Sequence, residues 1–379
     1  MAEKTPNQQL AEKLLFKPAY AGDKSAAVKQ EARAFAEGYK KFLDAGKTER
    51  EVAAESEQML KDAGYQLFDP KKTYAPGDKV YFIQLNKAVV ASTIGTRPYE
   101  EGFHLVIAHT DSPRLDLRPN PLYESDHFSY FKTHYYGGIK YYQWVTLPLA
   151  LHGVICKKDG TTVTVSVGEK EDDPVFCISD LLIHLAAEQM GKTARDAVEG
   201  ESLNLIVGGR PLNGTEKDAV KANVLKLLEK QYDVEEEDFI SAELEIVPAG
   251  RARDLGFDRS MILGYGHDDR VCAFPSMAAV LDWQGTPENT LCAVLTDKEE
   301  IGSVGATGMG ATYFENTVAE LYNAVHGYDA LGVMRALQNS RMLSSDVSAG
   351  FDPNFPSVFE KKNAAFLGQG ICFNKFTGR

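Results

Sequence analysis

Two adjacent acids, Glu299 and Glu300, follow the apolar run of residues 292–295 and precede a glycine-rich segment. The run is typical of a buried strand, so both acids would emerge where that strand leaves the core. Open α/β sheets keep their chemistry at this edge. Because successive side chains near a strand end diverge, one glutamate could bind a cation while the other handles a proton. A solvated acidic turn is the commoner explanation of a lone pair, unless other strands also end in ligand-type residues.

A histidine and an acid end another apolar run, residues 103–109. His109 is the last residue of that run, and Asp111 follows two positions later. This spacing places the imidazole and the carboxylate on the same side of an extended chain. The carboxylate can hold the imidazole in the tautomer that a metal requires. A structural histidine with satisfied hydrogen bonds is the alternative, and His-x-Asp alone does not exclude it.

Two further acids stand beside predicted helices. Asp268 precedes an amphipathic helix and can bind a cation singly or as a bridge, although an acid also suits a helix N-terminus. Four candidate ligands thus lie next to predicted strand ends or helix ends: His109, Asp268, Glu300 and Asp346. Such a hard-to-borderline set fits a two-zinc hydrolytic centre. Glu299 would take a proton from the attacking water and pass it to the leaving amine.

The surrounding pattern predicts an α/β protein. Residues 1–64 have helical periodicity, and short β-type runs begin at Lys79. Residues 250–379 resume the alternation of strands and helices, and a glycine-flanked strand is predicted over residues 366–379. The candidate ligands would therefore be positioned by strand ends of an α/β domain.

Residues from about 119 to 246 predict a separate, β-rich unit. It contains a hairpin signal at residues 158–160 and a segment, residues 178–190, that predicts a helix. It also carries five aromatic residues close together in the sequence: Tyr135, Tyr136, Tyr141, Tyr142 and Trp144. These side chains could form an interface with another subunit or fill the core of the unit itself.

Composition limits the classes of function. The chain has 379 residues, of which 44% are hydrophobic and 25% charged, as in ordinary globular proteins. The formal charge of -13 argues against nucleic acid as a partner. No apolar run reaches membrane-spanning length and the N-terminus lacks a signal-peptide pattern, so no membrane partner and a cytoplasmic location are expected. Five scattered cysteines predict no disulfides.

Five short motifs occur in a fixed order: HTDSP, YYGGI, the Asp268-Asp269 segment, DKEEIGS and SSDVSAGFDPNF. In this order, and over nearly the whole chain, the sequence resembles the M18 family of metalloaminopeptidases. The resemblance is closest to the bacterial aminopeptidase 1 branch, which is related to aspartyl aminopeptidases.

The resemblance implies a role for each candidate residue. His109 resembles a ligand of one zinc and Asp346 its partner, while Asp268 resembles the bridging carboxylate. Glu300 looks like a ligand of the second metal, and Glu299 like the general base. The resemblance also implies two supporting catalytic residues. Asp111 would orient His109, and His184 would reach the active site of a neighbouring subunit.

The resemblance also implies the architecture and the partners. A zinc-peptidase-like α/β/α catalytic domain, residues 1–118 and 247–379, would be interrupted by a β-rich dimerisation domain, residues 119–246. The expected substrates are peptides with a neutral or acidic N-terminal residue. The expected assembly is a homo-oligomer, a dodecamer built from dimers. Two Zn²⁺ ions per subunit are expected, although Co²⁺ or Mn²⁺ also tolerate such ligands.

The sequence departs from the family pattern in two ways. Ala349 and Asp352 stand where relatives often carry histidine, and the family's last zinc ligand falls in a stretch that would follow Arg379. We therefore expect either a fragment of a longer protein or a chain with an incomplete metal centre. The second case would be a truncated, non-catalytic assembly subunit. A deacylase of related two-metal architecture is a further alternative.

Overall fold

The computed structural model describes residues 4–376, which form two compact units. Residues 39–346 make up the larger unit, whereas residues 4–38 and 347–376 belong to the smaller one. Among the described residues, no helix is both long and apolar enough to cross a bilayer.

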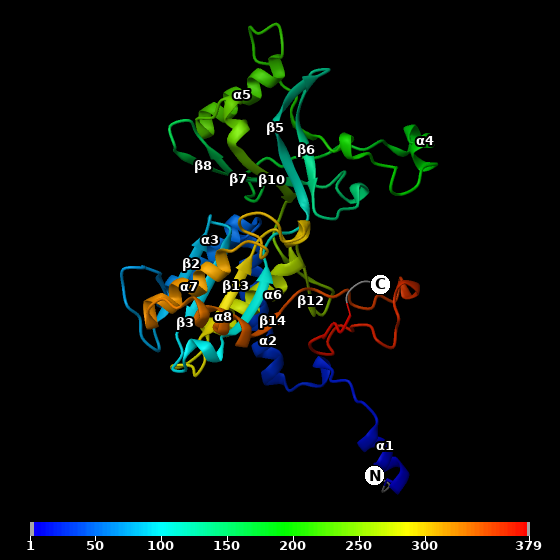
Figure 1. Cartoon of the computed structure of the whole chain (residues 1–379). Coiled ribbons are helices and arrows are strands. Elements are labelled where there is room, and N and C mark those ends of the chain that lie inside the picture. Colours follow the sequence, from blue (N-terminus) through cyan, green and yellow to red (C-terminus); the bar gives the residue numbers. More distant parts are fainter. Residues whose placement is uncertain (1–3, 377–379) are drawn as a thin grey trace. The chain divides into compact units, whose positions relative to one another are not determined.

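A six-stranded sheet lies in the larger unit (Figure 1). Its strands are β1 (Gln66–Leu67), β2 (Lys79–Gln84), β3 (Ala88–Thr93), β4 (His104–His109), β13 (Leu291–Thr296) and β14 (Arg341–Ser344). They lie in the order β1-β2-β3-β13-β4-β14. β4, β13 and β14 are parallel, and Thr296 is paired in register with His109. The carboxyl ends of these three strands therefore meet at one edge of the sheet.

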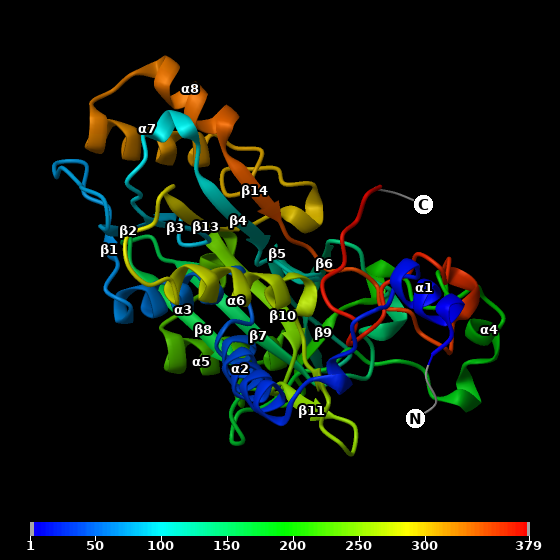
Figure 2. The same ribbon diagram turned by 90° about the horizontal axis from the view of Figure 1, so that it is seen from below.

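Helices cover both faces of this sheet (Figures 1 and 2). Because strand side chains alternate, Cys292 and Val294 pack on one face and Ala293 and Leu295 on the other. The first face is covered by α7 (Tyr313–His326) and α8 (Ala330–Asn339). The second is covered by α3 (Glu49–Asp62), α6 (His267–Leu281) and the end of α2 (Ala26–Ala45). The α/β class expected from the sequence is confirmed.

The second sheet of the larger unit is antiparallel throughout. Its strands are β5 (Arg114–Ser125), β6 (Phe128–Tyr136), β7 (Leu149–Cys156), β8 (Thr162–Val167), β9 (Leu205–Gly208) and β10 (Ala242–Pro248), in the order β8-β7-β10-β5-β6-β9. Helix α5 (Ala219–Tyr232) packs on it through Val224 and partly buried leucines. The predicted hairpin turn is confirmed, because β7 and β8 pair and Gly160 between them has a φ of +86°.

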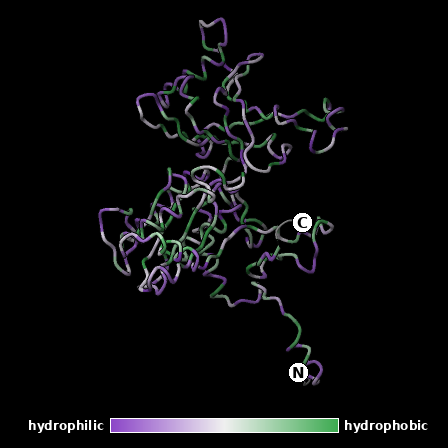
Figure 3. Tube along the Cα trace, viewed as in Figure 1, coloured by the Kyte–Doolittle hydropathy of each residue, from purple (hydrophilic) through white to green (hydrophobic). Residues whose placement is uncertain are grey.

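Hydrophobic and hydrophilic stretches alternate along the chain (Figure 3). The aromatic group of the second sheet is divided between core and surface. Trp144 and Tyr136 are buried, whereas Tyr135 and Tyr142 are 48% and 42% exposed. A short hairpin of β11 (Arg253–Leu255) and β12 (Met261–Leu263) precedes α6.

The helix predicted over residues 178–190 is wrong. Only a 3-10 turn, Ile183–Leu185, and the four-residue helix α4 (Ala187–Met190) form there. The apolar residues of this segment follow one another instead of recurring every third or fourth position. The Asp180 carboxylate also accepts hydrogen bonds from Leu181 N and Gln189 Nε2, both at 2.8 Å, and this favours turns over a regular helix.

In the smaller unit, α1 (Pro6–Leu14) starts at a capping box in which Thr5 and Gln8 bond reciprocally. The strand predicted over residues 366–379 is wrong for residues 366–376, which form no strand; residues 377–379 lie outside the described part. Gly368 and Gly370 have φ angles of +78° and +100°, which extended strands do not adopt. The backbone oxygen of Gly368 instead accepts a hydrogen bond from Ala21 N at 2.7 Å.

Candidate metal centre

The carboxyl edge of the first sheet collects the candidate ligands. His109 ends β4, and a 3-10 turn at Glu299–Ile301 follows β13. Asp346 lies two residues after the end of β14, while Asp268 lies in the first turn of α6, where its backbone angles are not helical. Parallel pairing explains this convergence, because β4, β13 and β14 deliver their last residues to the same edge.

Three of these side chains lie within metal-binding distance of one another. His109, Asp268 and Asp346 each offer a ligand atom, and these atoms all lie within 4.8 Å. His109 Nε2 lies 3.1 Å from Asp268 Oδ1, 3.8 Å from Asp346 Oδ1 and 3.7 Å from Glu299 Oε2. The imidazole is buried, while the side chains of Asp268, Glu299 and Asp346 are 45–55% exposed. A small ligand can therefore reach the carboxylates from solvent.

Asp111 is fully buried and organises the cluster from behind. Its carboxylate oxygens accept hydrogen bonds from the Tyr136 hydroxyl at 2.7 Å and from the backbone N–H groups of Glu299 and Glu300, both at 3.2 Å. The same carboxylate lies 3.2 Å from His109 Nδ1. A proton on Nδ1 leaves the Nε2 lone pair directed at the cluster, which is the tautomer a metal needs.

Electrostatics in the cluster favour a bound cation. Burial opposes a charge on His109, but hydrogen bonds with Asp111 and Asp268 raise its pKa to about 11. Burial, followed by the charge of Asp268, raises the pKa of Glu300 to about 7. Burial also raises the pKa of Glu299. Without a metal the cluster therefore favours bound protons, because burial and the neighbouring negative charges disfavour further ionisation of Glu299 and Glu300, while the carboxylates stabilise a charge on His109.

Unpaired atoms provide an independent test of whether a metal fits. Glu300 Oε1 is buried and has no hydrogen-bond partner among the described residues, and the buried atoms His109 Nε2 and Asp268 Oδ1 face each other at 3.1 Å. Both carboxylate oxygens of Asp269 are also buried without a hydrogen-bond partner among the described residues. Buried polar atoms are normally satisfied, so unsatisfied carboxylate oxygens beside a histidine nitrogen match the ligand preference of Zn²⁺.

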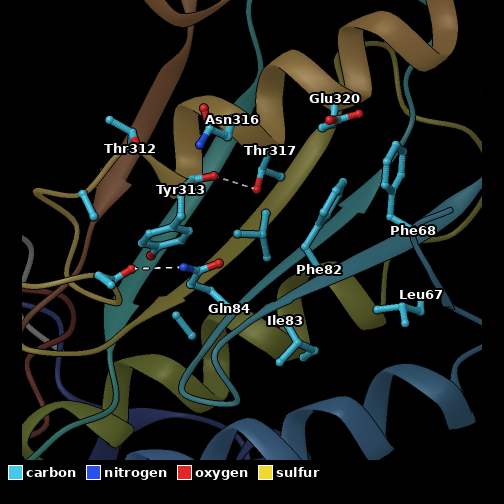
Figure 4. Close-up of a pocket in the computed structure, with 14 residues that line it drawn as sticks. Leu67, Phe68, Phe82, Ile83, Gln84, Thr312, Tyr313, Asn316, Thr317 and Glu320 are labelled. Carbon is cyan, nitrogen blue, oxygen red and sulfur yellow. Dashed lines mark hydrogen bonds between the residues drawn. The ribbon is translucent and has the colours of Figure 1, made fainter. Parts of the chain in front are cut away.

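A pocket of about 430 Å³ adjoins this cluster. Its lining includes the polar residues Asp268 and Ser112 and the apolar residues Ile139 and Trp144. A second pocket, of about 470 Å³, lies between β2 and α7 and is lined by Phe68, Phe82 and other residues (Figure 4). None of the candidate ligands lines the second pocket, whereas Asp268 lines the first, which can therefore hold a molecule against the cluster.

The structure brings together the predicted residues His109, Asp111, Asp268, Glu299, Glu300 and Asp346. It does not bring His184 to them: this residue lies in the exposed turn Ile183–Leu185. The sequence did not identify Tyr136 as the hydrogen-bond donor to Asp111. Its presence in the YYGGI motif was the only signal.

Comparisons with known proteins agree with this geometry. Residues 42–378 match the family described as aminopeptidase I zinc metalloprotease (M18). The chain is 53% identical over 354 residues to a probable M18 family aminopeptidase 1 of Clostridium acetobutylicum, covering 92% of this chain and 76% of that protein. The crystal structure of aminopeptidase I from Clostridium acetobutylicum has a TM-score of 0.87 at 48% identity, covering 96% of this chain and 80% of that one.

An M18-family aminopeptidase structure from Thermotoga maritima also has a TM-score of 0.87, at 39% identity, covering 94% of this chain and 78% of that one. The S. cerevisiae mApe1 dodecamer, with a TM-score of 0.70 and 21% identity over 87% of this chain and 75% of that one, shows the shared fold alone. The resemblance drawn from the five motifs is confirmed. The chain belongs to the M18 family of zinc metalloaminopeptidases.

Proposed function

We propose that this chain is a two-zinc aminopeptidase that removes the N-terminal residue of peptides. The observation that carries the proposal is the convergence of His109, Asp268 and Asp346 within 4.8 Å, beside the unpaired Oε1 of Glu300. His109 and Asp346 would hold one ion, Glu300 would hold the other, and Asp268 would bridge them. Co²⁺ or Mn²⁺ could replace zinc in such a set.

When bound, zinc supplies positive charge that acidifies a water molecule and polarises the peptide carbonyl. Glu299 takes the proton from that water and passes it to the leaving amine. This role is supported by its partly exposed carboxylate, 3.7 Å from His109 Nε2, and by the upward shift of its pKa through burial. Asp111 keeps the His109 imidazole in the ligand tautomer.

The substrate would be a peptide with a free N-terminal amine and a neutral or acidic first residue. An acidic cluster attracts a protonated amine, which supports exopeptidase activity. The adjoining pocket of about 430 Å³ would receive the first side chain, and its lining includes the apolar Ile139 and Trp144 and the cationic Lys140. Peptides with a free amine would therefore be hydrolysed in preference to N-acylated ones.

The assembly would be a homo-oligomer in which residues 119–246 form a dimerisation domain and residues 1–118 and 247–379 form the catalytic domain. An exposed apolar strip in that segment supports this role: Leu181, Leu182, Ile183 and Leu185. His184 lies in the strip and would act in a neighbouring subunit's site. The mApe1 structure of the same fold is a dodecamer. Cytoplasmic residence stays a prediction.

Replacing Glu299 with glutamine tests the proposal. Glu299→Gln removes the proton acceptor but keeps the side-chain volume, so kcat should fall about 100- to 10,000-fold. Zinc content, measured by elemental analysis after dialysis, should stay as in the wild type. Glu171→Gln, at an exposed position of the second sheet's segment, is the matched control and should retain full turnover. Unchanged turnover of Glu299→Gln would overturn the assignment of the base.

A further inference from the structure

Tyr136 joins the second sheet to the candidate metal centre. It is the last residue of β6, it is 6% exposed, and its hydroxyl donates to Asp111 Oδ2 at 2.7 Å. The other Asp111 oxygen lies near His109 Nδ1 and Glu299 N. Tyr136 therefore contacts Asp111 directly, and Asp111 in turn orients the predicted zinc ligand His109.

The Tyr136 ring is itself held in place by a cation. The guanidinium carbon of Arg114 lies 3.8 Å from the ring centroid, and Lys298 Nζ lies 5.5 Å from it. A buried guanidinium over an aromatic face is a favourable and directional contact. The ring therefore has little freedom to turn its hydroxyl away from Asp111.

Arg114 is fixed in turn by what we name the buried ion network. Its members are Glu49, Lys87, Arg114, Asp116 and Glu245. Arg114 lies 3.2 Å from a Glu49 oxygen, 2.8 Å from Asp116 and 3.1 Å from Glu245. Glu49 belongs to α3 on the first sheet, whereas Glu245 belongs to β10 of the second. The network therefore ties the two sheets together directly behind Tyr136.

We propose that Tyr136 and Arg114 are positioning residues for the metal centre, so that the second sheet completes the catalytic site of its own chain. The inference rests on the proposed metal ligands, but it concerns a different contact. The hydroxyl of Tyr136 occupies one lone pair of Asp111 Oδ2, which keeps the carboxylate oriented toward His109 Nδ1. Without that bond the carboxylate keeps only its two longer bonds, from the backbone N–H groups of Glu299 and Glu300 at 3.2 Å, so it holds the imidazole less firmly. The backbone oxygen of Asp111 still lies 3.0 Å from His109 Nδ1, so we expect a weakened metal site and not a lost one.

Simple packing is the competing explanation, because a buried tyrosine also fills space at the meeting of two sheets. The two explanations differ in what the hydroxyl contributes. Packing depends on the ring, which phenylalanine retains, whereas positioning depends on the O–H group alone. Metal affinity distinguishes them, since a packing role predicts that it does not change.

The test compares Tyr136→Phe with Tyr135→Phe, its exposed neighbour, in the full chain. Zn²⁺ affinity is measured by competition with a chromophoric chelator, and the absorption spectrum of the Co²⁺-loaded protein reports ligand geometry. We expect Tyr136→Phe to weaken Zn²⁺ binding about 10- to 100-fold and to alter the Co²⁺ spectrum. Tyr135→Phe should leave both unchanged. Wild-type affinity and an unaltered spectrum in Tyr136→Phe would overturn the inference.

A double-mutant cycle keeps the inference testable even if Tyr136→Phe loses stability. In an Asp111→Asn background, Tyr136→Phe should cause no further loss of Zn²⁺ affinity, because both changes interrupt the same link. Fully additive losses would contradict the link. Failure of this inference is distinct from failure of the proposed function: in the first case the wild type still binds zinc and turns over, whereas in the second it does not.

Discussion

The acidic cluster at the sheet edge and the buried ion network behind it contain similar side chains in opposite arrangements. In the network, Glu49 is fully buried and has cations on both oxygens, Lys87 Nζ at 3.1 Å and an Arg114 nitrogen at 3.2 Å. In the cluster, His109 is the one cationic side chain described within reach of several carboxylates. Glu49 therefore has two cationic partners of its own, whereas the carboxylates of the cluster share one histidine.

This difference separates a structural role from a binding role. A buried charge is tolerated when the protein supplies its partner, as Arg114 does for Glu49. Carboxylates that face one another without enough protein cations are stabilised by a bound proton or metal ion. The raised pKa of Glu300 shows that its ionised form is unfavourable in the metal-free protein. Removing an acid should therefore have opposite effects on stability in the two regions.

The larger effect is expected in the network. Glu49→Gln leaves Arg114 and Lys87 without their shared partner in a buried site, so the protein should lose about 3 kcal/mol of unfolding free energy. Urea unfolding of the metal-free protein at neutral pH measures this loss. Glu31→Gln, at an exposed position of α2, is the control and should change stability by less than about 0.5 kcal/mol. If Glu49→Gln and Glu31→Gln change the free energy of unfolding equally, Glu49 has no special stabilising role, and the contrast between the ion network and the acidic cluster is wrong.

A smaller effect of the opposite sign is expected in the cluster. The pKa of Glu300 in the folded protein is raised from 4.5 to about 7. The unfolded chain therefore loses this proton at a lower pH than the folded protein, so the group destabilises the fold increasingly from about pH 4.5 and fully above about pH 7. Glu300→Gln should therefore stabilise the metal-free protein by about 1 kcal/mol at pH 8, allowing for partial exposure to solvent. At pH 5 the gain should nearly vanish.

Saturating zinc should reverse the sign of the Glu300→Gln effect, because the variant loses a ligand that stabilises the loaded protein. Thermal unfolding at pH 5 and pH 8, with and without zinc, measures all four states. If Glu300→Gln instead destabilises the metal-free protein at pH 8, the ionised Glu300 has a stabilising partner within the protein. That result would contradict the claim that the carboxylates of the cluster lack enough protein cations.

Much of the fold could be predicted because strand ends carry strong local signals. The apolar run that ends at His109 forms β4, and the run before the two glutamates forms β13. Parallel pairing then brings His109, Glu300 and Asp346 to one edge, a convergence that follows from general α/β topology, and Asp268 joins them from the first turn of α6. The failed helix at residues 178–190 had no single apolar stripe to define a buried face.

The supporting contacts could not be predicted because they join residues far apart in the chain. Arg114 of β5 meets Glu49 of α3 and Glu245 of β10, and Tyr136 of β6 meets Asp111, through tertiary contacts that no local pattern encodes. Charge or aromatic character alone did not single out these residues, since exposed examples such as Tyr135 have the same type. Sequence patterns thus indicated the candidate ligands but not what holds them.

The most direct test of the central claim is metal content per chain after dialysis, measured together with hydrolysis of leucyl- and aspartyl-arylamides. The proposal predicts about two zinc ions per chain and turnover that a chelator abolishes and that zinc or cobalt restores. One ion or none at saturating zinc, or turnover that survives complete chelation, would contradict the account of the acidic cluster as a two-metal hydrolytic centre.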